Sequence, residues 1–377
     1  MTIKFSTPAI ILMFCGMMGC NADNQNTETT TDSLVVNGRD SMNVQPKELK
    51  PKGPKPEWAP DIDDEMAVVM EKLAGYGAPP LETLSPQEAR KQPTPTTAVM
   101  DVMKEHNIAM PPSTVDTMGK DIPVNGGMVH ARIYTPRGSD SSYPVIVYYH
   151  GGGWVIADLD VYDASARGLA EQAGAVVVSV HYRQGPEFKF PTAHNDAFAA
   201  YQWVLKNAAS IKANPHLIAV AGESAGGNLA CNVSIMARDK GIKIPVHQLL
   251  VYPVANNDMN SVSYQKYGTA KPLSKPLIEW MVKNYLPNTA AAADPRISLI
   301  KANFKGLPPT TIIAAEIDLL QSEGKILADK LKDAGVSVDY KLYEGVTHEF
   351  YGMATVVPDA KDAQALAAAK LKAAFNK

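Results

Sequence analysis

Eight short segments rich in β-branched and aromatic residues follow one another after residue 112. They span residues 115–124, 128–136, 143–151, 175–183, 217–224, 247–254, 310–316 and 338–345. From the third segment onward most are continuous apolar runs, which is typical of strands covered on both faces. Helical patterns such as those over residues 163–174 and 196–210 separate them. The pattern therefore predicts βαβ units and an eight-stranded, mainly parallel sheet flanked by helices, an α/β fold occupying residues 113–377.

Two groups of helical patterns lie outside this alternation. Before the sheet, within residues 61–112, apolar side chains recur at three- and four-residue spacing, and Ser85, Pro86 and Glu88 form a helix-start signal. Between the sixth and seventh strands, an insertion at about 255–300 is too long for a simple crossover. Such segments either cover a site or only extend the core, and the pattern alone favours neither.

The first twenty residues form the pattern of an export signal. An apolar run over residues 8–18, too short to span a bilayer, precedes Gly19 and Cys20. It resembles a bacterial lipoprotein cleavage site, although Met17 stands where leucine is usual. We expect a lipoprotein-like signal over residues 1–20 and an exported protein, periplasmic or in the cell envelope and lipid-anchored to the membrane at Cys20. An ordinary signal peptide of a secreted protein is the alternative.

Residues 21–60 are rich in Asn, Thr, Asp, Lys and Pro and contain few large apolar side chains. Such a segment cannot offset its ordering entropy by burial, so we expect a disordered linker.

Charge and cysteine usage exclude several classes of function. The net charge is only −3 and the basic residues are scattered, so nucleic acid is not an expected partner and a small neutral substrate is. No cluster of metal ligands has a credible spacing. Cys231 lies among apolar residues of a predicted helix, which indicates a buried, unreactive thiol. No pattern indicates an oligomeric state.

A serine between two glycines follows the fifth strand and opens a helix. Gly222, Ser224 and Gly226 form a G-x-S-x-G pattern, which is weak alone because glycine and serine are common. In a strand-turn-helix setting, however, neighbouring backbones come close and only minimal side chains fit beside the serine. The serine is pushed out at the carboxyl end of the sheet, near a helix N-terminus. Ser224 is therefore a candidate nucleophile.

A serine nucleophile needs a base, and histidine suits this role because its pKa lies near 7. Motifs of this kind are followed in the chain by the acid and then the histidine, on loops after later strands. Of the eight histidines only His247 and His348 follow Ser224. His247 begins the sixth strand, whereas His348 comes just past the eighth, so we expect His348 to be the base.

The acid that orients this histidine is expected after a strand between the two. The end of the seventh strand supplies Glu316 and Asp318. Glu316 still belongs to the strand and Asp318 to the following loop, so Asp318 is preferred. Asp258 and Asp294, in the insertion, are more distant choices.

A glycine run directly after the third strand is a candidate for stabilising the negative charge that develops during the reaction. The segment "HGGG" comprises His150, Gly151, Gly152 and Gly153, and glycine adopts positive φ angles that aim N–H groups without an obstructing side chain. We expect the N–H groups of Gly152, Gly153 and Ala225 to form an oxyanion hole, and His150 to brace the loop. A Walker-type phosphate loop is excluded, because no Lys-Ser/Thr pair follows the glycines.

Together these segments resemble the hormone-sensitive-lipase-like branch of the α/β-hydrolases, which includes many bacterial esterases. The match runs from about residue 61 to about 369 and includes "LSPQEAR", "HGGGWV", "HYRQGPEFKFPTA", "GESAGGN", "DPRISLI", "DLLQSEG" and "GVTHEF" in the family's order. The resemblance implies an α/β-hydrolase fold whose N-terminal helices and insertion form a cap. It also implies hydrolysis of small to medium acyl esters through an acyl-enzyme, with Ser224, Asp318 and His348 as triad and no metal or organic cofactor.

Two departures from the family pattern concern substrate range rather than reaction type. Glu223 stands where the family often has Asp or Thr, and Leu319 where Pro is common after the acid. Within "HYRQGPEFKFPTA" we expect Arg183 and Glu187 to pair. An amidase or peptidase with the same triad, and a non-catalytic ligand-binding protein on this fold, are the alternatives to a carboxylesterase.

Overall fold

The computed structural model describes residues 49–138 and 140–376 of the chain. The predicted signal, including Cys20, and residues 21–48 of the predicted linker lie outside the described residues.

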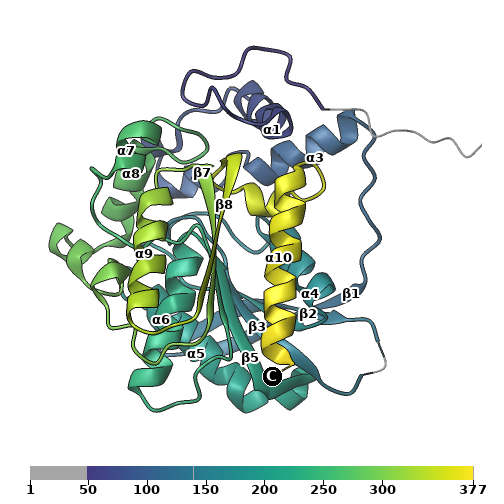
Figure 1. Ribbon diagram of the computed structural model, residues 1–377, viewed down its shortest axis with the longest axis vertical. Coiled ribbons are helices and arrows are strands. Elements are labelled where there is room, and N and C mark those ends of the chain that lie inside the picture. The colour runs from purple at the N-terminus through teal and green to yellow at the C-terminus, as the bar shows by residue number, and fades with distance from the viewer. Residues whose placement is uncertain (1–48, 139, 377) are drawn as a thin grey trace, which may run out of the picture. The chain divides into compact units, whose positions relative to one another are not determined.

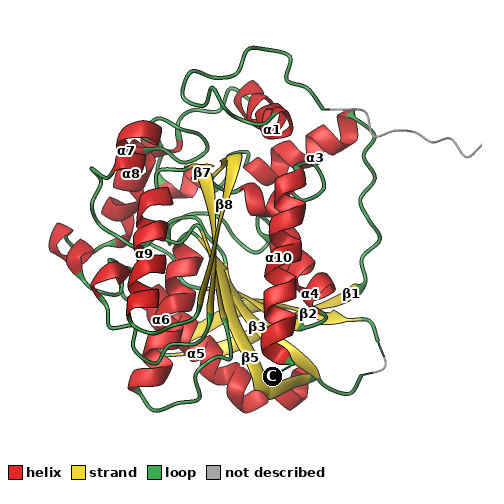
Figure 2. Ribbon diagram, in the orientation of Figure 1, coloured by secondary structure: helices red, strands yellow, loops and turns green. Residues whose placement is uncertain are grey.

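The sheet has eight strands in the order β1-β2-β4-β3-β5-β6-β7-β8. Figure 2 shows the strands in yellow, with the helices in red around them. Their bounds are β1 Val115–Val124, β2 Gly127–Pro136, β3 Tyr143–Tyr149, β4 Val176–His181, β5 Ala213–Glu223, β6 Gln248–Val251, β7 Thr310–Ile317 and β8 Val338–Thr347. The pairings of β2 with β1 and with β4 are antiparallel, and all other pairings are parallel. In β4 the first five residues are buried, as a strand covered on both faces requires. The predicted eight-stranded, mainly parallel sheet is therefore confirmed.

Ten α-helices accompany this sheet in the described part of the chain. Their bounds are α1 Asp64–Gly75, α2 Pro86–Ala89, α3 Pro95–Glu105, α4 Asp163–Ala173, α5 Thr192–Asn207, α6 Ala225–Asp239, α7 Val262–Tyr267, α8 Lys275–Tyr285, α9 Gln321–Asp333 and α10 Pro358–Phe375. Helices α4 and α10 cover one face of the sheet, and α5, α6 and α9 cover the other (Figure 1). Helix α1 packs against α3, near the end of β8. The predicted start of α2 is correct, because Ser85 caps it with Pro86 at the first turn and Glu88 reaching back.

Residues 49–60 fold with the rest of the described chain. Leu49 and Ala59 are buried, and the Glu71 carboxylate of α1 accepts hydrogen bonds from the N–H groups of Lys52 and Gly53 at 2.8 and 2.6 Å. The prediction that the linker extends to residue 60 is therefore wrong for residues 49–60. Two buried anchors and one carboxylate suffice to fix a segment that is already stiffened by prolines.

Candidate active site

Ser224 sits at the sharp turn between β5 and α6 in a conformation that non-glycine residues rarely adopt. Its φ and ψ are 57° and −119°, and its N–H donates to the Val251 carbonyl at 2.9 Å. A Cβ on Gly222 would lie 2.2 Å from the Gly226 oxygen, and one on Gly226 would lie 1.9 Å from the Tyr149 oxygen. Both glycines are therefore required for the backbone approach that presents Ser224.

His348 and Asp318 come from the ends of β8 and β7 and meet as a buried pair. His348 Nδ1 lies 2.7 Å from Asp318 Oδ2, while Asp318 Oδ1 accepts the Leu320 N–H at 2.9 Å. Burial opposes protonation of His348, but the charge and hydrogen bond of Asp318, with the charges of Glu349 and Glu223, outweigh it and raise the pKa of His348. Such a histidine holds its Nδ1 proton toward the acid and keeps Nε2 available as a base.

The other carboxylates considered from the sequence face elsewhere. Glu316 accepts the Gly345 N–H at 3.0 Å, Asp294 pairs with Arg296 at 2.8 Å, and Asp258 accepts the Asn260 N–H at 2.9 Å. The structure thus brings only Asp318, among these four, against His348.

The glycine loop after β3 lies in the same pocket as Ser224 and His348. Gly152 and Gly153 have φ angles of 94° and 60°. A Cβ on Gly152 would lie 2.2 Å from the Ile156 oxygen, and one on Gly153 would lie 2.1 Å from Met281 Sδ. Among the hydrogen bonds found within residues 49–138 and 140–376, none uses the N–H of Gly152 or Gly153 as donor. These groups are free to bind a ligand oxygen, beside the helix N-terminus that Ala225 begins.

His150 braces this loop, as expected. Its ring stacks on Tyr182 at 4.4 Å between centroids, and Nδ1 lies 2.8 Å from the Gly151 carbonyl oxygen. Burial, with the nearby His181, lowers the pKa of His150 to about 3, so the ring is neutral. It is therefore not suited to act as a base near neutral pH.

Arg90 of the N-terminal region binds the segment that follows the glycine loop. Its guanidinium donates to the Val155 carbonyl at 2.8 Å and pairs with Glu187 at 2.8 Å. The predicted pair of Arg183 and Glu187 is wrong, because Arg183 instead pairs with the buried Asp196 at 2.6 Å. Asp196 binds Arg183 in preference to Glu187, although Glu187 is only four residues away, because Asp196 is already buried and fixed on α5.

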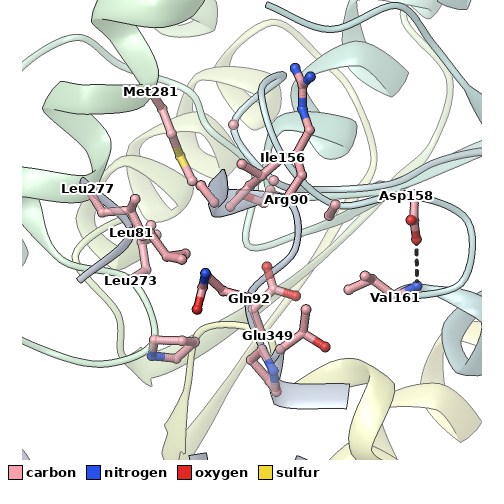
Figure 3. Close-up of a pocket in the computed structure, with 18 of the residues that line it drawn as sticks. Leu81, Arg90, Gln92, Ile156, Asp158, Val161, Leu273, Leu277, Met281 and Glu349 are labelled. Atoms are coloured by element: carbon pink, nitrogen blue, oxygen red, sulfur yellow. Dashed lines mark hydrogen bonds between the residues drawn. The ribbon is translucent and has the colours of Figure 1, made fainter. Parts of the chain in front are cut away.

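The pocket above Ser224, hereafter the Ser224 pocket, has a volume of about 210 Å³. Figure 3 shows Leu81, Leu273, Leu277 and Met281 gathered on one side of it, and Asp158 with Val161 on the other. The lining combines residues from the N-terminal region with residues from the insertion. Both segments therefore cover the site as a cap.

The hydrogen bonds found in the described part of the chain do not include one between Ser224 Oγ and His348 Nε2, although both residues line the Ser224 pocket. Such contacts are often long without substrate and tighten in the complex with substrate. The arrangement brings Ser224, the buried pair of His348 and Asp318, and the N–H groups of the glycine loop to one small apolar pocket.

Glu349 is a pocket residue that the sequence pattern did not indicate. It has a φ of 72°, lies with Oε1 3.9 Å from His348 Nε2, and accepts a hydrogen bond from the Tyr162 hydroxyl at 2.6 Å. Burial raises its pKa, against the opposing effects of His348 and Tyr162. The only signal in the sequence is its place next to His348.

Glu223, beside the nucleophile, points away from the pocket into a buried cluster. It accepts hydrogen bonds from the hydroxyl groups of Tyr148, at 2.5 Å, and Tyr252. Burial and the charge of Glu349 raise the pKa of Glu223 to about 7, despite these hydrogen bonds. Its side chain therefore contributes to the support under Ser224 rather than to the substrate surface.

Cys231 is buried in α6, and burial raises its pKa to about 12, so the thiol is not a nucleophile near neutral pH. In the part of the chain that the structure describes, no helix combines the length and apolar character needed to cross a bilayer. No cluster of three or more His, Cys, Asp or Glu side chains suited to a metal ion occurs among residues 49–138 and 140–376.

A family model described as alpha/beta hydrolase fold matches residues 146–352. The chain is similar to carboxylesterase NlhH of Mycobacterium tuberculosis, with 38% identity over 68% of this chain and 79% of the relative. It is also similar to ethyl acetate hydrolase of Pseudomonas putida, with 31% identity over 75% of this chain and 88% of the relative.

Solved structures of esterases share the fold. A thermostable esterase from Pseudomonas putida superimposes with a TM-score of 0.77 at 32% identity, covering 84% of this chain and 98% of that one. A hyperthermophilic esterase from Pyrobaculum calidifontis superimposes with a TM-score of 0.73 at 34% identity, covering 81% and 96%.

Proposed function

The chain belongs to the hormone-sensitive-lipase-like family of α/β-hydrolases and is a carboxylic ester hydrolase, and on this basis we propose a role in the reaction for each residue of its site. Ser224 is the nucleophile, His348 the general base and acid, and Asp318 the group that orients His348. The N–H groups of Gly152, Gly153 and Ala225 form the oxyanion hole.

The reaction proceeds in two halves. His348 Nε2 takes the Ser224 proton as Oγ attacks the ester carbonyl, and the oxyanion hole holds the resulting negative charge. The bond between the acyl carbon and the alcohol oxygen then breaks, which leaves the acyl group on Ser224 Oγ, and His348 gives the proton to the leaving alcohol oxygen. Water, deprotonated by His348, attacks the acyl-enzyme, and the acid leaves as the Ser224 proton is restored.

One observation carries this assignment. The strained Ser224, with φ 57°, opens into the same pocket as His348, whose Nδ1 lies 2.7 Å from Asp318. Backbone strain of this kind is retained where the surrounding structure fixes it for chemistry. The pocket's apolar side, with Leu81, Leu277 and Met281, supports an uncharged acyl or alcohol group as substrate.

The test compares Ser224→Ala with wild type on p-nitrophenyl esters. We expect kcat/KM to fall on the order of 10⁴-fold or more, with thermal unfolding little changed, because Ala accommodates the same turn. Ser234→Ala is the matched control, since Ser234 is a buried serine of α6, the helix that follows Ser224, and does not line the pocket. Retained activity in Ser224→Ala contradicts the proposal.

A matched pair of an acyl ester and an acyl anilide separates ester from amide hydrolysis. We expect the ester to turn over faster, because an amide nitrogen leaves only when it is protonated. Faster hydrolysis of the anilide contradicts the assignment as an esterase.

We propose further that the protein is exported and lipid-anchored at Cys20. The support is the sequence pattern alone, an apolar run over residues 8–18 followed by Gly19 and Cys20. In a bacterial host, wild type and Cys15→Ser should incorporate labelled palmitate and fractionate with membranes, and Cys20→Ser should do neither. Release of unlabelled wild-type protein into the soluble fraction favours an ordinary secretory signal instead.

A further inference from the structure

A second cavity, of about 560 Å³, adjoins the Ser224 pocket. The two share Leu81, Gln92, Pro93, Pro95, Pro272 and Leu277 as lining residues. A side chain that lines both spaces separates them by no more than its own thickness. The second cavity therefore directly adjoins the Ser224 pocket, with Leu81 and Leu277 at the boundary between the two spaces.

The lining of this cavity is unusually rich in proline. Eight prolines contribute to it, among them Pro51, Pro54 and Pro56 of the segment that precedes α1. Proline has no backbone N–H, so these walls offer few hydrogen-bond donors. We call this space, lined by the prolines together with Trp58, Met70 and others, the proline-lined cavity. Its walls suit a hydrocarbon chain or an aromatic ring rather than a sugar or a phosphate.

The charged residues of the lining do not make the proline-lined cavity a site for a charged ligand. The Glu71 carboxylate is already engaged by the N–H groups of Lys52 and Gly53, and Lys271 is exposed to solvent. Glu82 is half-buried. Neither a positive nor a negative cluster results, so an uncharged ligand is favoured.

The walls are held in place without a ligand. Glu71 ties residues 52 and 53 to α1, and the Ala59 N–H donates to the Pro56 carbonyl at 2.9 Å. The Trp280 indole N–H of α8 donates to the Leu84 carbonyl at 3.1 Å, which ties the segment that carries Leu81 to the helix that carries Leu277. A ligand therefore meets a preformed space and loses little free energy to ordering the protein.

The volumes of the two spaces also favour their use as one ligand site. Small-molecule sites typically measure roughly 300–1,000 Å³. The Ser224 pocket alone, at about 210 Å³, falls below this range, whereas the Ser224 pocket together with the proline-lined cavity falls within it.

We infer that the proline-lined cavity is the binding site for the apolar chain or ring of larger esters, which extends into it from the Ser224 pocket between Leu81 and Leu277. The inference rests on the proposed function and specifies its substrate class: esters that carry a medium-length alkyl or an aryl group on one side of the carbonyl. Small esters such as acetates of short alcohols need only the Ser224 pocket.

The test fills the proline-lined cavity from a surface position. Ala74 is an exposed residue of α1 that lines this cavity but not the Ser224 pocket, so Ala74→Trp narrows one space and leaves the other as it is. The matched control is Gly75→Trp at the next position. An added Cβ at Gly75 meets no atom within 4 Å, and Gly75 lines neither space. Ala78→Trp, from a different segment of the lining, is the second variant should Ala74→Trp fold poorly.

Two substrate series identify which half of the ester enters the cavity. One lengthens the acyl group from acetate to laurate with p-nitrophenol as alcohol, and the other keeps acetate and lengthens the alcohol from ethanol to decanol. Burying one methylene is worth roughly fourfold in affinity, so in one series the ratio of kcat/KM for the longest to the shortest ester should fall at least about tenfold in Ala74→Trp. Gly75→Trp should keep the wild-type ratio in both series.

An unchanged ratio in both series for Ala74→Trp and Ala78→Trp overturns the inference. The same ratio loss in Gly75→Trp also overturns it, because the effect then does not come from filling the cavity. Failure of the proposed function is distinguishable, since wild type would then hydrolyse no member of either series.

Discussion

Glu349→Gln should move the acid limb of the pH-rate profile, because this carboxylate lies within ion-pair distance of His348 Nε2. Glu349 Oε1 lies 3.9 Å from His348 Nε2 and is among the charges that raise the pKa of His348. The amide keeps the size of the side chain and its acceptor for Tyr162, but removes the negative charge that favours the imidazolium. The pKa of His348 should therefore fall, and with it the pH below which activity is lost.

The magnitude follows from the separation of the two groups. Two unit charges about 4 Å apart interact by about 1 kcal/mol in bulk water and by about 4 kcal/mol at an effective dielectric constant of about 20. At about 1.4 kcal/mol for each pKa unit, these limits correspond to roughly 0.7 and 3 units. The raised pKa of Glu349 itself reduces its charge at acidic pH. The expected shift is consequently near the lower limit, about one unit downward.

The assay measures kcat/KM for p-nitrophenyl acetate between pH 4 and 9 for three variants and wild type. Tyr162→Phe removes the hydroxyl that donates to Glu349 and should give a smaller shift in the same direction, because the Glu349 carboxylate is then more readily protonated. Glu344→Gln, an exposed carboxylate of β8, is the matched control and should leave the profile unchanged. An acid limb of Glu349→Gln that coincides with that of wild type refutes the electrostatic coupling.

Gly153→Ala should lower kcat for p-nitrophenyl acetate by roughly 10²–10³-fold with a small change in thermal unfolding, because a Cβ at φ 60° displaces the loop N–H while the flexible Met281 side chain can give way. Steady-state kinetics and thermal unfolding of the variant check this prediction. A kcat equal to that of wild type excludes the role of the Gly153 N–H. Glu323→Gln should reduce the pH dependence of stability. Burial raises the pKa of Glu323 to about 8, so the native state keeps a proton that the unfolded chain releases above about pH 4.5. The stabilisation is therefore complete below the ordinary pKa near 4.5 and is lost as the pH rises through the folded-state pKa of about 8. Thermal unfolding at pH 6 and 9 should therefore show a smaller loss for Glu323→Gln than for wild type, and parallel losses contradict the assigned pKa.

The sheet, and the pairing of His348 with Asp318 at its carboxyl edge, could be predicted because burial and chain order constrain them strongly. Strands such as β4 read as continuous apolar runs since both of their faces are covered. Asp318 could be distinguished from Glu316 by its place one residue beyond β7, and the structure turns Glu316 toward Gly345 instead. These inferences use local pattern and sequential position, which the sequence carries directly.

Partners chosen by three-dimensional competition could not be predicted in this way. Arg183 had a carboxylate four residues away in Glu187 but pairs with Asp196, while Glu187 binds Arg90 from nearly a hundred residues earlier. Glu349 enters the pocket because its backbone turns to a φ of 72° directly after His348. Neither spacing nor composition encodes such a choice, since each depends on which groups the fold has already desolvated.

The proline-rich end of the predicted linker shows that composition alone does not predict whether a segment is ordered. A chain with few large apolar residues stays disordered when burial cannot repay its conformational entropy. Prolines reduce that entropy in advance, so residues 49–60 need only the buried Leu49 and Ala59 and the carboxylate of Glu71 to become fixed. The same prolines then supply rigid walls without hydrogen-bond donors to a cavity that adjoins Ser224. A segment whose composition predicts a passive tether thus has the properties required of an apolar binding surface, and in the inferred site part of the substrate range is set by residues that precede the family motifs.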